Sequence, residues 1–352
     1  MGTTITLLSY KEEENLKILI PKIIENIEKV ESDYEILVVD TEKPLDNTAT
    51  VCEAFGARYV NQKYPGFGGA FKTAIEHAQK KYFLIMDSDG SHNPLYIPSI
   101  YKKFINANAD VVIGSRYIKG GKTCDTASSI VMSKILNAAF RVCLGIKAHD
   151  ISTDYRMYYT EQLKQVTLEN RNYDVLQEVL LKLKLKKPEL EIGEVPIVFT
   201  KRIYGESKRQ LLPFIVSYIK SLFRLTCMRF PALKNFFLYA LIGGMGALID
   251  YSIFSVCVIK EVFPAYANIL GALCGFCFTF FMNTFFNFNK RTHILKRLIS
   301  YGAVCIFGTI ISTFCIWQLS KSVSNIYLLK LGLLLIISLL QFALNKRITY
   351  KS

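Results

Sequence analysis

Apolar residues in the first half of the chain come in short runs separated by longer stretches of mixed character. Five of these runs have the length of buried strands: 4–8, 35–40, 57–61, 82–86 and 110–114. Between the first two runs, Leu16, Ile20 and Ile23 recur at helical spacing. Strands that alternate with helices predict an α/β domain built on a largely parallel sheet.

The second half of the chain has much longer apolar runs. Four of them are each long enough to cross a bilayer as a helix: 236–259, 265–286, 298–319 and 326–344. The preceding segment, 211–230, is apolar but carries Lys220 and Arg224 one helical turn apart, which predicts a helix lying in the membrane interface. We therefore expect three parts: a globular domain over 1–210, interfacial helices over 211–234, and an all-α transmembrane domain of four helices over 235–352.

Charge agrees with this division. The chain of 352 residues is 51% hydrophobic and has a formal net charge of +14. Basic residues gather beside the predicted spans, in 201–234 and in the loop after the second span, whereas the loops after the first and third spans have few. This asymmetry predicts an integral membrane protein with both termini in the cytosol, and it explains the positive charge without a nucleic-acid partner. The start of the chain, "MGTTITLLSYKEEE", lacks a signal segment, so we expect the globular domain to stay in the cytosol.

The apolar half also contains a similar sequence twice. "FFNFNKR" (285–291) and "QFALNKR" (341–347) each close the second helix of a predicted hairpin. Two interpretations remain open: a duplicated hairpin, or basic residues placed independently at two inner faces of a membrane.

Acidic residues follow three of the predicted strands. Glu12 comes after the first, Asp40 ends the second, and Asp87 and Asp89 end the fourth in "YFLIMDSDGSHNP". Ligands of parallel sheets bind at the carboxyl ends of strands, and alternate residues of an extended segment face the same way. Asp87 and Asp89 are therefore candidate ligands for Mg²⁺ or Mn²⁺ completed by substrate phosphates. The alternatives are that Asp-Ser-Asp only caps a turn and that His92 is a further ligand rather than part of that turn.

These landmarks resemble the family 2 glycosyltransferases. The matching sequences, in order, are "SYKEEENL" (9–16), "YEILVVD" (34–40), "GFGGAFKTAIEHA" (66–78), "LIMDSDGSHNP" (84–94), "VVIGSRYIKGG" (111–121), "DISTDYRMY" (150–158) and "EVPIVFTKRIYGESK" (194–208). Within the family the order is similar to dolichyl-phosphate mannose synthases and bacterial polyprenyl-phosphate hexose synthases, and the tail resembles a GtrA-like domain.

The resemblance implies a GT-A fold, a Rossmann-like, mostly parallel sheet, and an inverting enzyme. This enzyme would move a hexose, mannose or glucose, from a GDP- or UDP-hexose to polyprenyl or dolichyl phosphate at the cytosolic face of a prokaryotic cell membrane. It implies a site role for each of the following residues: Glu12, Asp40 and Asp87 for the donor nucleotide; Asp87 and Asp89 for Mg²⁺ or Mn²⁺; Arg116, Ser133, Arg202 and Lys208 for the acceptor phosphate; and Asp89, Arg116 and Arg202 for catalysis.

Four positions depart from the family pattern. Lys11 stands where asparagine is usual, Leu8 replaces a proline, Thr41 replaces a second aspartate, and Asp154 places an acid where the family has a residue without a side chain. These changes fall in the expected pocket, so the identity of the donor stays open.

Two other functions stay in view. A transferase that extends a glycan would fit the same fold, but processive members carry a Gln-x-x-Arg-Trp sequence, and the one tryptophan here, Trp317, lies in a predicted span. A transporter of lipid-linked sugars with a regulatory cytosolic domain is favoured by one residue, Asp250, because charge within a span marks transport pathways.

Overall fold

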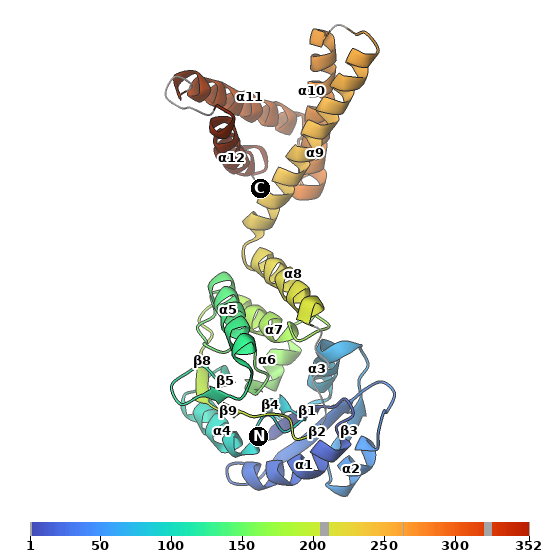
Figure 1. The fold of residues 1–352 in the computed structure, drawn as a ribbon, viewed down its shortest axis with the longest axis vertical. Helices are drawn as coiled ribbons and strands as arrows, with labels where there is room; N and C mark the ends of the chain where they lie inside the picture. The colour runs from blue at the N-terminus through green and yellow to red at the C-terminus, as the bar shows by residue number, and fades with distance from the viewer. Residues whose placement is uncertain (1, 205–210, 263, 320–325, 352) are drawn as a thin grey trace. The chain divides into compact units, whose positions relative to one another are not determined.

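The computed structural model describes residues 2–204, 211–262, 264–319 and 326–351. The chain divides into two compact units, Met1–Arg229 and Phe230–Ser352. Figure 1 shows the helices and strands of both units with their labels.

The first unit contains a seven-stranded sheet in the order β3-β2-β1-β4-β7-β5-β8. Its strands are β1 (Thr3–Leu8), β2 (Tyr34–Asp40), β3 (Arg58–Asn61), β4 (Tyr82–Asp87), β5 (Val111–Ser115), β7 (Arg156–Tyr159) and β8 (Ile192–Pro196). All neighbouring strands pair in parallel except β7, which is antiparallel to both β4 and β5. The short strands β6 (Lys122–Thr123) and β9 (Val198–Phe199) form a second sheet. The five strands expected from the sequence are confirmed, and β6 to β9 are additional.

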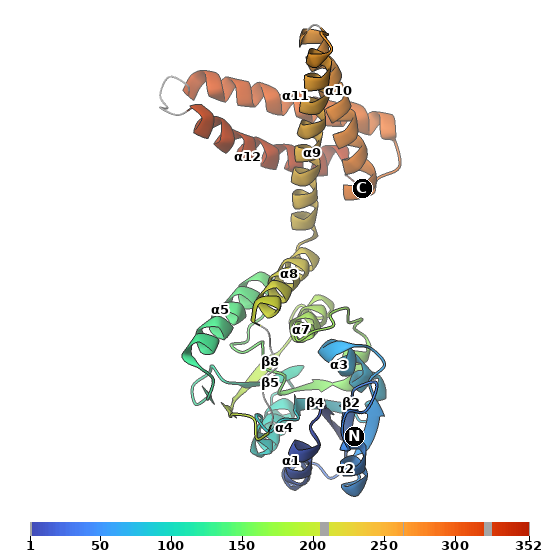
Figure 2. The same ribbon diagram turned by 45° about the vertical axis from the view of Figure 1, so that its right-hand side comes forward.

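Helices cover both faces of the large sheet, as Figure 2 shows from a second direction. Because side chains alternate along a strand, Ile36 and Val38 face a core formed with α1 (Glu13–Ile27), α2 (Thr48–Ala54), η1 (Pro94–Tyr96) and α4 (Ile97–Asn106). Leu37 and Val39 face the opposite core, formed with α3 (Gly66–His77), α5 (Ala127–Leu144), α6 (Thr160–Lys164), α7 (Val175–Lys186) and α8 (Leu211–Arg229). Both faces are buried, which explains why the strands read as continuous apolar runs.

The helix expected at the membrane interface, α8, packs on α5 and α7 within this unit. Arg224 on α8 forms an ion pair with Glu169, and Arg229 donates to the carbonyl of Cys143 at the end of α5. α8 leaves Val216, Ile219 and Phe223 exposed. α5 is long and apolar enough to cross a membrane, by length and hydropathy alone, yet it is a surface helix of this unit.

The second unit consists of two helical hairpins, α9 (Pro231–Ile259) with α10 (Pro264–Met282), and α11 (Ile294–Leu319) with α12 (Ile326–Leu344). Each predicted span falls on one of them, with the end of the second span reaching into η2. Among the described residues of this unit, Pro231–Cys257 is long and apolar enough to cross a membrane. The number of crossings stays a prediction. Asp250 lies within the uninterrupted α9, close to Gly271 of α10.

The two hairpins repeat each other at a separation of 62 residues. Each ends in a π-helix, η2 (Asn283–Asn287) and η3 (Asn345–Thr349). Asn283 donates to the hydroxyl of Tyr301, and its equivalent Asn345 donates to Tyr239, the equivalent of Tyr301.

Ring contacts and close helix packing follow the same repeat. Phe280 contacts Tyr301 and Phe342 contacts Tyr239, each pair with ring centroids 5.7 Å apart. Gly246 packs on Thr279 as Gly308 packs on Gln341. The structure therefore favours a duplicated hairpin, but in a different register from the two Asn-Lys-Arg sequences.

Candidate active site

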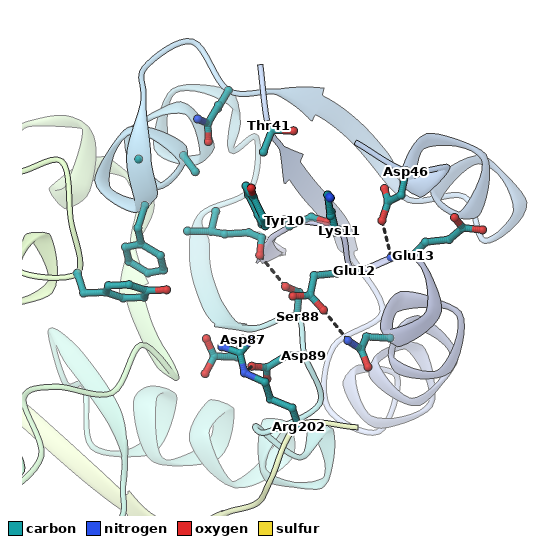
Figure 3. Close-up of a pocket in the computed structure, with 18 of the residues that line it drawn as sticks. Tyr10, Lys11, Glu12, Glu13, Thr41, Asp46, Asp87, Ser88, Asp89 and Arg202 are labelled. Carbon is teal, nitrogen blue, oxygen red and sulfur yellow. Dashed lines mark hydrogen bonds and ion pairs between the residues drawn. The ribbon is translucent and has the colours of Figure 1, made fainter. Parts of the chain in front are cut away.

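A cavity of about 980 Å³ opens at the carboxyl ends of β1, β2 and β4. Figure 3 shows most of the residues that line it. Tyr10, Lys11 and Glu12 come from the loop after β1, Thr41 follows β2, and Asp87 and Asp89 end β4 or follow it. Sequence reasoning placed ligands at this edge because parallel strands that lie side by side end together.

Ser91 holds the two aspartates of the Asp-Ser-Asp motif near each other. Its hydroxyl lies 2.5 Å from Asp89 Oδ1 and 3.2 Å from Asp87 Oδ2, and its backbone N–H donates to Asp89 Oδ1 at 2.9 Å. Asp89 is 6% exposed. The motif thus makes a tight turn as well as presenting carboxylates.

Glu12 adds a third carboxylate to this end of the cavity. It accepts a hydrogen bond of 2.5 Å from Asn15. Burial raises the pKa of Glu12 above its ordinary value, with the nearby Asp89 acting in the same direction and the Asn15 hydrogen bond opposing it. A site that crowds carboxylates in this way favours a cation.

Asp154, which departs from the family pattern, lies beside Asp87. Ligand atoms of Asp87, His92 and Asp154 all fall within 4.8 Å of one another. Burial, reinforced by the neighbouring Asp87, raises the pKa of Asp154 well above its ordinary value. The carboxylate oxygens of Asp87, Asp89 and Asp154 are the hard ligands that Mg²⁺ and Mn²⁺ prefer, so the residues present fit a divalent cation.

His92 has a different part. Its Nδ1 accepts from the backbone N–H of Asp87 at 3.0 Å, and its Nε2 lies 3.2 Å from the Thr153 hydroxyl. Burial lowers the pKa of His92 below its ordinary value. A neutral imidazole with both nitrogens engaged positions the Asp87 loop, which agrees with the structural role considered from the sequence.

Asp40 does not line the cavity. It is 1% exposed and accepts hydrogen bonds from the Tyr59 hydroxyl at 3.0 Å and the Thr41 backbone at 2.8 Å. Burial raises the pKa of Asp40 above its ordinary value. Its role in nucleotide binding stays a prediction, and its visible role is to hold the β2 end, from which Thr41 faces the cavity.

Lys11 has a backbone φ of 61°, in the left-handed region. Asparagine adopts this conformation more readily than lysine. The asparagine of the family pattern therefore suits the backbone here, and lysine instead adds a positive charge to the cavity wall.

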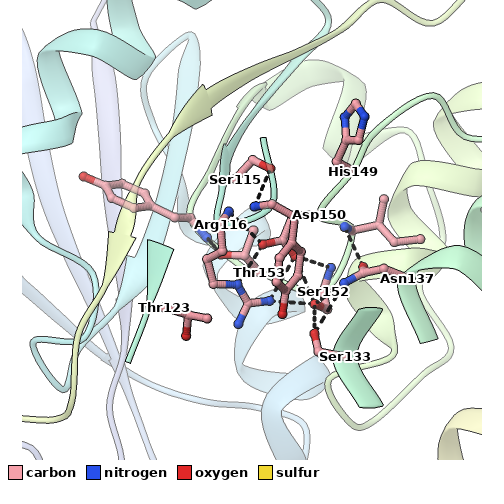
Figure 4. Close-up of polar contacts among 12 residues, drawn as sticks. Ser115, Arg116, Thr123, Ser133, Asn137, His149, Asp150, Ser152 and Thr153 are labelled. Atoms are coloured by element: carbon pink, nitrogen blue, oxygen red, sulfur yellow. Dashed lines mark hydrogen bonds and ion pairs between the residues drawn. The ribbon is translucent and has the colours of Figure 1, made fainter. Parts of the chain in front are cut away.

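A second polar cluster surrounds Arg116, as Figure 4 shows. Its guanidinium binds both oxygens of Asp150 through two nitrogens on one edge, Nε to Oδ2 at 2.7 Å and Nη2 to Oδ1 at 3.0 Å. Nη2 also donates to Ser152 at 2.7 Å. Although burial opposes it, the hydrogen bonds and charge of Arg116 hold the pKa of Asp150 below its ordinary value.

Ser133 on α5 joins this cluster, with its hydroxyl 3.4 Å from that of Ser152. The structure thus brings together two of the four predicted acceptor residues, Arg116 and Ser133. Arg202 lies instead at the cavity, with Nε 2.9 Å from Asp89 Oδ2. Lys208 lies outside the described residues.

Sequence reasoning missed Asp150, Ser152 and Asn137 as members of the Arg116 cluster. Asn137 donates to Ser152 at 3.1 Å and accepts from the Ile151 backbone. The signal available was the polar segment 150–154, the start of the landmark sequence "DISTDYRMY". Its partners come from β5 and α5, and no local pattern identifies them.

Each of the two units matches a known family model. Residues 4–167 match the model of Glycosyl transferase family 2, and residues 238–350 match that of the GtrA/DPMS transmembrane domain. A dolichol-phosphate mannosyltransferase of Pyrococcus furiosus is 27% identical over 331 residues, 91% of each chain. A polyprenol monophosphomannose synthase of Mycolicibacterium smegmatis is 29% identical over 58% of this chain and 80% of its own length.

Solved structures agree with the fold of the first unit. Glucosyl-3-phosphoglycerate synthase from Mycobacterium tuberculosis in complex with phosphoglyceric acid matches with a TM-score of 0.51 and 19% identity, covering 64% of this chain and 80% of that one. Its complex with Mg²⁺ and uridine-diphosphate matches with a TM-score of 0.50 and 17% identity, covering 64% and 79%. The likeness shows the expected GT-A fold.

Proposed function

We propose that this chain transfers a hexose from a nucleotide sugar to the phosphate of a membrane polyprenol. Its matches to Glycosyl transferase family 2 and to the GtrA/DPMS transmembrane domain support this proposal. The observation that carries the proposal is the meeting of the Asp87 and Asp89 carboxylates with Arg202 at one end of the cavity. The carboxylates suit the metal of a sugar nucleotide, and the arginine suits a phosphate acceptor. The names of the two relatives favour mannose as the hexose.

The donor would lie along the cavity, with its nucleotide toward Tyr10, Lys11 and Thr41 and its diphosphate toward Asp87 and Asp89. A divalent cation held by these two aspartates, with Asp154 beside them, would supply Lewis-acid stabilisation of the departing diphosphate. Lys11 would add positive charge on the nucleotide side.

The acceptor reacts through its phosphate. A phosphate monoester has a second pKa of about 6, so it is ionised at neutral pH and needs no general base. A phosphate oxygen forms the new bond to the anomeric carbon as the bond from that carbon to the diphosphate breaks, and the electron pair leaves with the nucleoside diphosphate. One displacement of this kind inverts the anomeric carbon. Arg116, Ser133, Arg202 and Lys208 would hold the acceptor phosphate and screen its repulsion from the donor.

Access to a lipid acceptor is supported by the apolar surfaces of the catalytic unit. α5 exposes Val131, Ile135 and Val142, and α8, which packs on α5, exposes Ile219 and Phe223. We infer that both helices lie in the membrane interface. We also propose that both termini are cytosolic, so labelling should find Lys296 on the cytosolic side and Glu261 on the other.

The test is to incubate membranes containing the protein with labelled GDP-mannose, UDP-glucose and other nucleotide sugars, and to extract lipids. We expect label in a mild-acid-labile lipid with one donor, and none with the Asp89→Asn variant. If no donor labels such a lipid, the proposal fails. Label that appears instead in a water-soluble glycan would favour the glycan-extending alternative.

A further inference from the structure

Arg202 forms an ion pair with Asp89, the carboxylate that a metal ion would bind. Its Nε lies 2.9 Å from Asp89 Oδ2, while the Asp89 side chain is 8% exposed and that of Arg202 is 34% exposed. Glu12 and Asp87 lie near this contact. Burial and repulsion among these carboxylates make further negative charge unfavourable here. The guanidinium thus supplies positive charge to an acidic site.

The backbone that carries Arg202 is fixed to the loop of the Asp-Ser-Asp motif. Thr200 N donates to the Ser91 carbonyl and Ile203 N donates to the Asp89 carbonyl, both at 3.1 Å. Gly90 has φ +80°, a conformation that strains any other residue, and the Ile203 side chain packs on the side where a Cβ would stand. Because the backbone is held on both sides of Arg202, its guanidinium can leave Asp89 by side-chain rotation while the segment stays in place.

From these contacts we propose that Arg202 and a divalent cation compete for Asp89, and that cation binding releases Arg202 for the acceptor phosphate. The inference rests on the proposed function for the identity of the acceptor. A cation bound to Asp89 would stand beside a guanidinium that now contacts the same carboxylate, and like charges at that distance repel. The displaced arginine keeps its charge but has lost its carboxylate, so a phosphate becomes its best partner. The metal therefore binds before the acceptor.

The first test measures Mn²⁺ binding to the purified full-length protein without substrates, with free Mn²⁺ read by electron paramagnetic resonance. Arg202→Gln should bind Mn²⁺ roughly fivefold more tightly or better, which is the effect of removing one partly exposed ion pair. Arg202→Lys, which keeps the charge, should stay closer to wild type. Lys201→Gln is the matched control, because Lys201 is the exposed neighbouring cation, and it should change affinity by less than about twofold.

Equal or weaker Mn²⁺ binding by Arg202→Gln would overturn the competition. So would an equal gain in Lys201→Gln, because it would show a general effect of charge. Unchanged melting temperatures of the variants would show that they are folded.

The second test measures binding of farnesyl phosphate, a short polyprenyl phosphate, with and without Mn²⁺. Wild type should bind it more tightly when Mn²⁺ is present, and Arg202→Gln should lose this gain. Binding to wild type that does not respond to Mn²⁺ would overturn the release of Arg202. If Mn²⁺ competition holds but no nucleotide sugar labels a lipid, the proposed function fails while the competition for Asp89 stands.

Discussion

Arg116 and Arg202 each pair with an aspartate, but the two ion pairs differ in burial and geometry. Arg116 is 10% exposed and binds both oxygens of a fully buried Asp150, with Ser152 as a third partner. Arg202 is about a third exposed and meets Asp89 through one nitrogen. A buried pair is costly to break because either partner alone would be an uncompensated charge, whereas a contact made by a partly exposed arginine exchanges more easily.

The comparison separates two residues to which the sequence gave one role. Both arginines were expected to bind acceptor phosphate, and residue type alone provides no reason to distinguish them. Their surroundings indicate that Arg116 is held in place by Asp150 and Ser152, while Arg202 can change partners. The following changes test that difference, from the largest expected effect to the smallest.

Asp89→Asn should reduce transfer by about 10⁴-fold or more, roughly 5.5 kcal/mol of transition-state stabilisation, because it removes a carboxylate from the metal site. The protein should remain folded, since asparagine keeps an oxygen that can accept the hydrogen bonds from Ser91 and the lost partner, Arg202, is partly exposed. Transfer assays with purified protein at varied Mn²⁺ would measure this. Full activity with unchanged metal dependence would show that the motif is only a turn.

Asp150→Ala should instead act on stability, lowering the free energy of unfolding by about 3–5 kcal/mol because Arg116 is left buried without its partner. The double variant Asp150→Ala with Arg116→Met should recover part of this loss. Thermal or denaturant unfolding would measure it, with Arg202→Ala as the change that breaks the exchangeable pair and keeps the bonds from Ser91 to Asp89. An equal loss of stability in Arg202→Ala would remove the distinction between the two pairs.

Arg202→Ala should raise the requirement for polyprenyl phosphate and slow transfer about tenfold or more, roughly 1.4 kcal/mol. Affinity for the nucleotide sugar should barely change. Kinetics with varied acceptor, together with equilibrium binding of the donor, would check both statements. A variant that lost the donor but kept the lipid phosphate would assign Arg202 to the donor site.

The buried pair should also respond to acid. The pKa of Asp150 is lower in the folded protein than in the unfolded chain, so its contribution to stability is present above the unfolded value, about 3.8. That contribution is lost as the pH falls through the folded value. Unfolding measured from pH 6 to pH 3 should show the stability gap between wild type and Asp150→Asn narrowing below about pH 4. A stability difference that stays constant with pH would mean that the charge of Asp150 does not stabilise the protein.

Ser152→Ala should have the smallest effect, about 1 kcal/mol of stability, because Arg116 keeps both bonds to Asp150. Unfolding measurements would detect it, and transfer should change little. A loss as large as that of Asp150→Ala would show that the serine, and not the carboxylate, fixes the arginine.

Much of the fold was predictable because the pattern of apolar residues is strong where both faces of the sheet are buried. β7 was missed for a physical reason: it begins with Arg156, a charged residue that is fully buried because its guanidinium donates to the backbone carbonyls of Ile151, Thr153 and Leu176. A charged residue within a short strand interrupts the apolar run by which the strand would be predicted.

The site was predictable where function depends on strand ends and not where it depends on tertiary contacts. Asp87 and Asp89 follow an apolar run and were found from it. Asp154 was noticed but unexplained, because its place beside Asp87 results from the antiparallel pairing of β7 with β4. The two Asn-Lys-Arg sequences do not occupy equivalent positions of the two hairpins. Residues 289–291 follow η2, whereas residues 345–347 lie within η3.

The repeat in the second unit also allows its halves to specialise. Thr284 bonds the hydroxyl of Tyr350 at 3.1 Å, but the equivalent positions hold Lys346 and Phe288, which lack hydroxyl groups. Two separate copies of one hairpin would have to carry every substitution twice. Joined in a single polypeptide, each copy keeps the shared asparagine and tyrosine contacts that set the packing, while its other positions evolve independently. One half can therefore acquire a new contact without imposing it on the other.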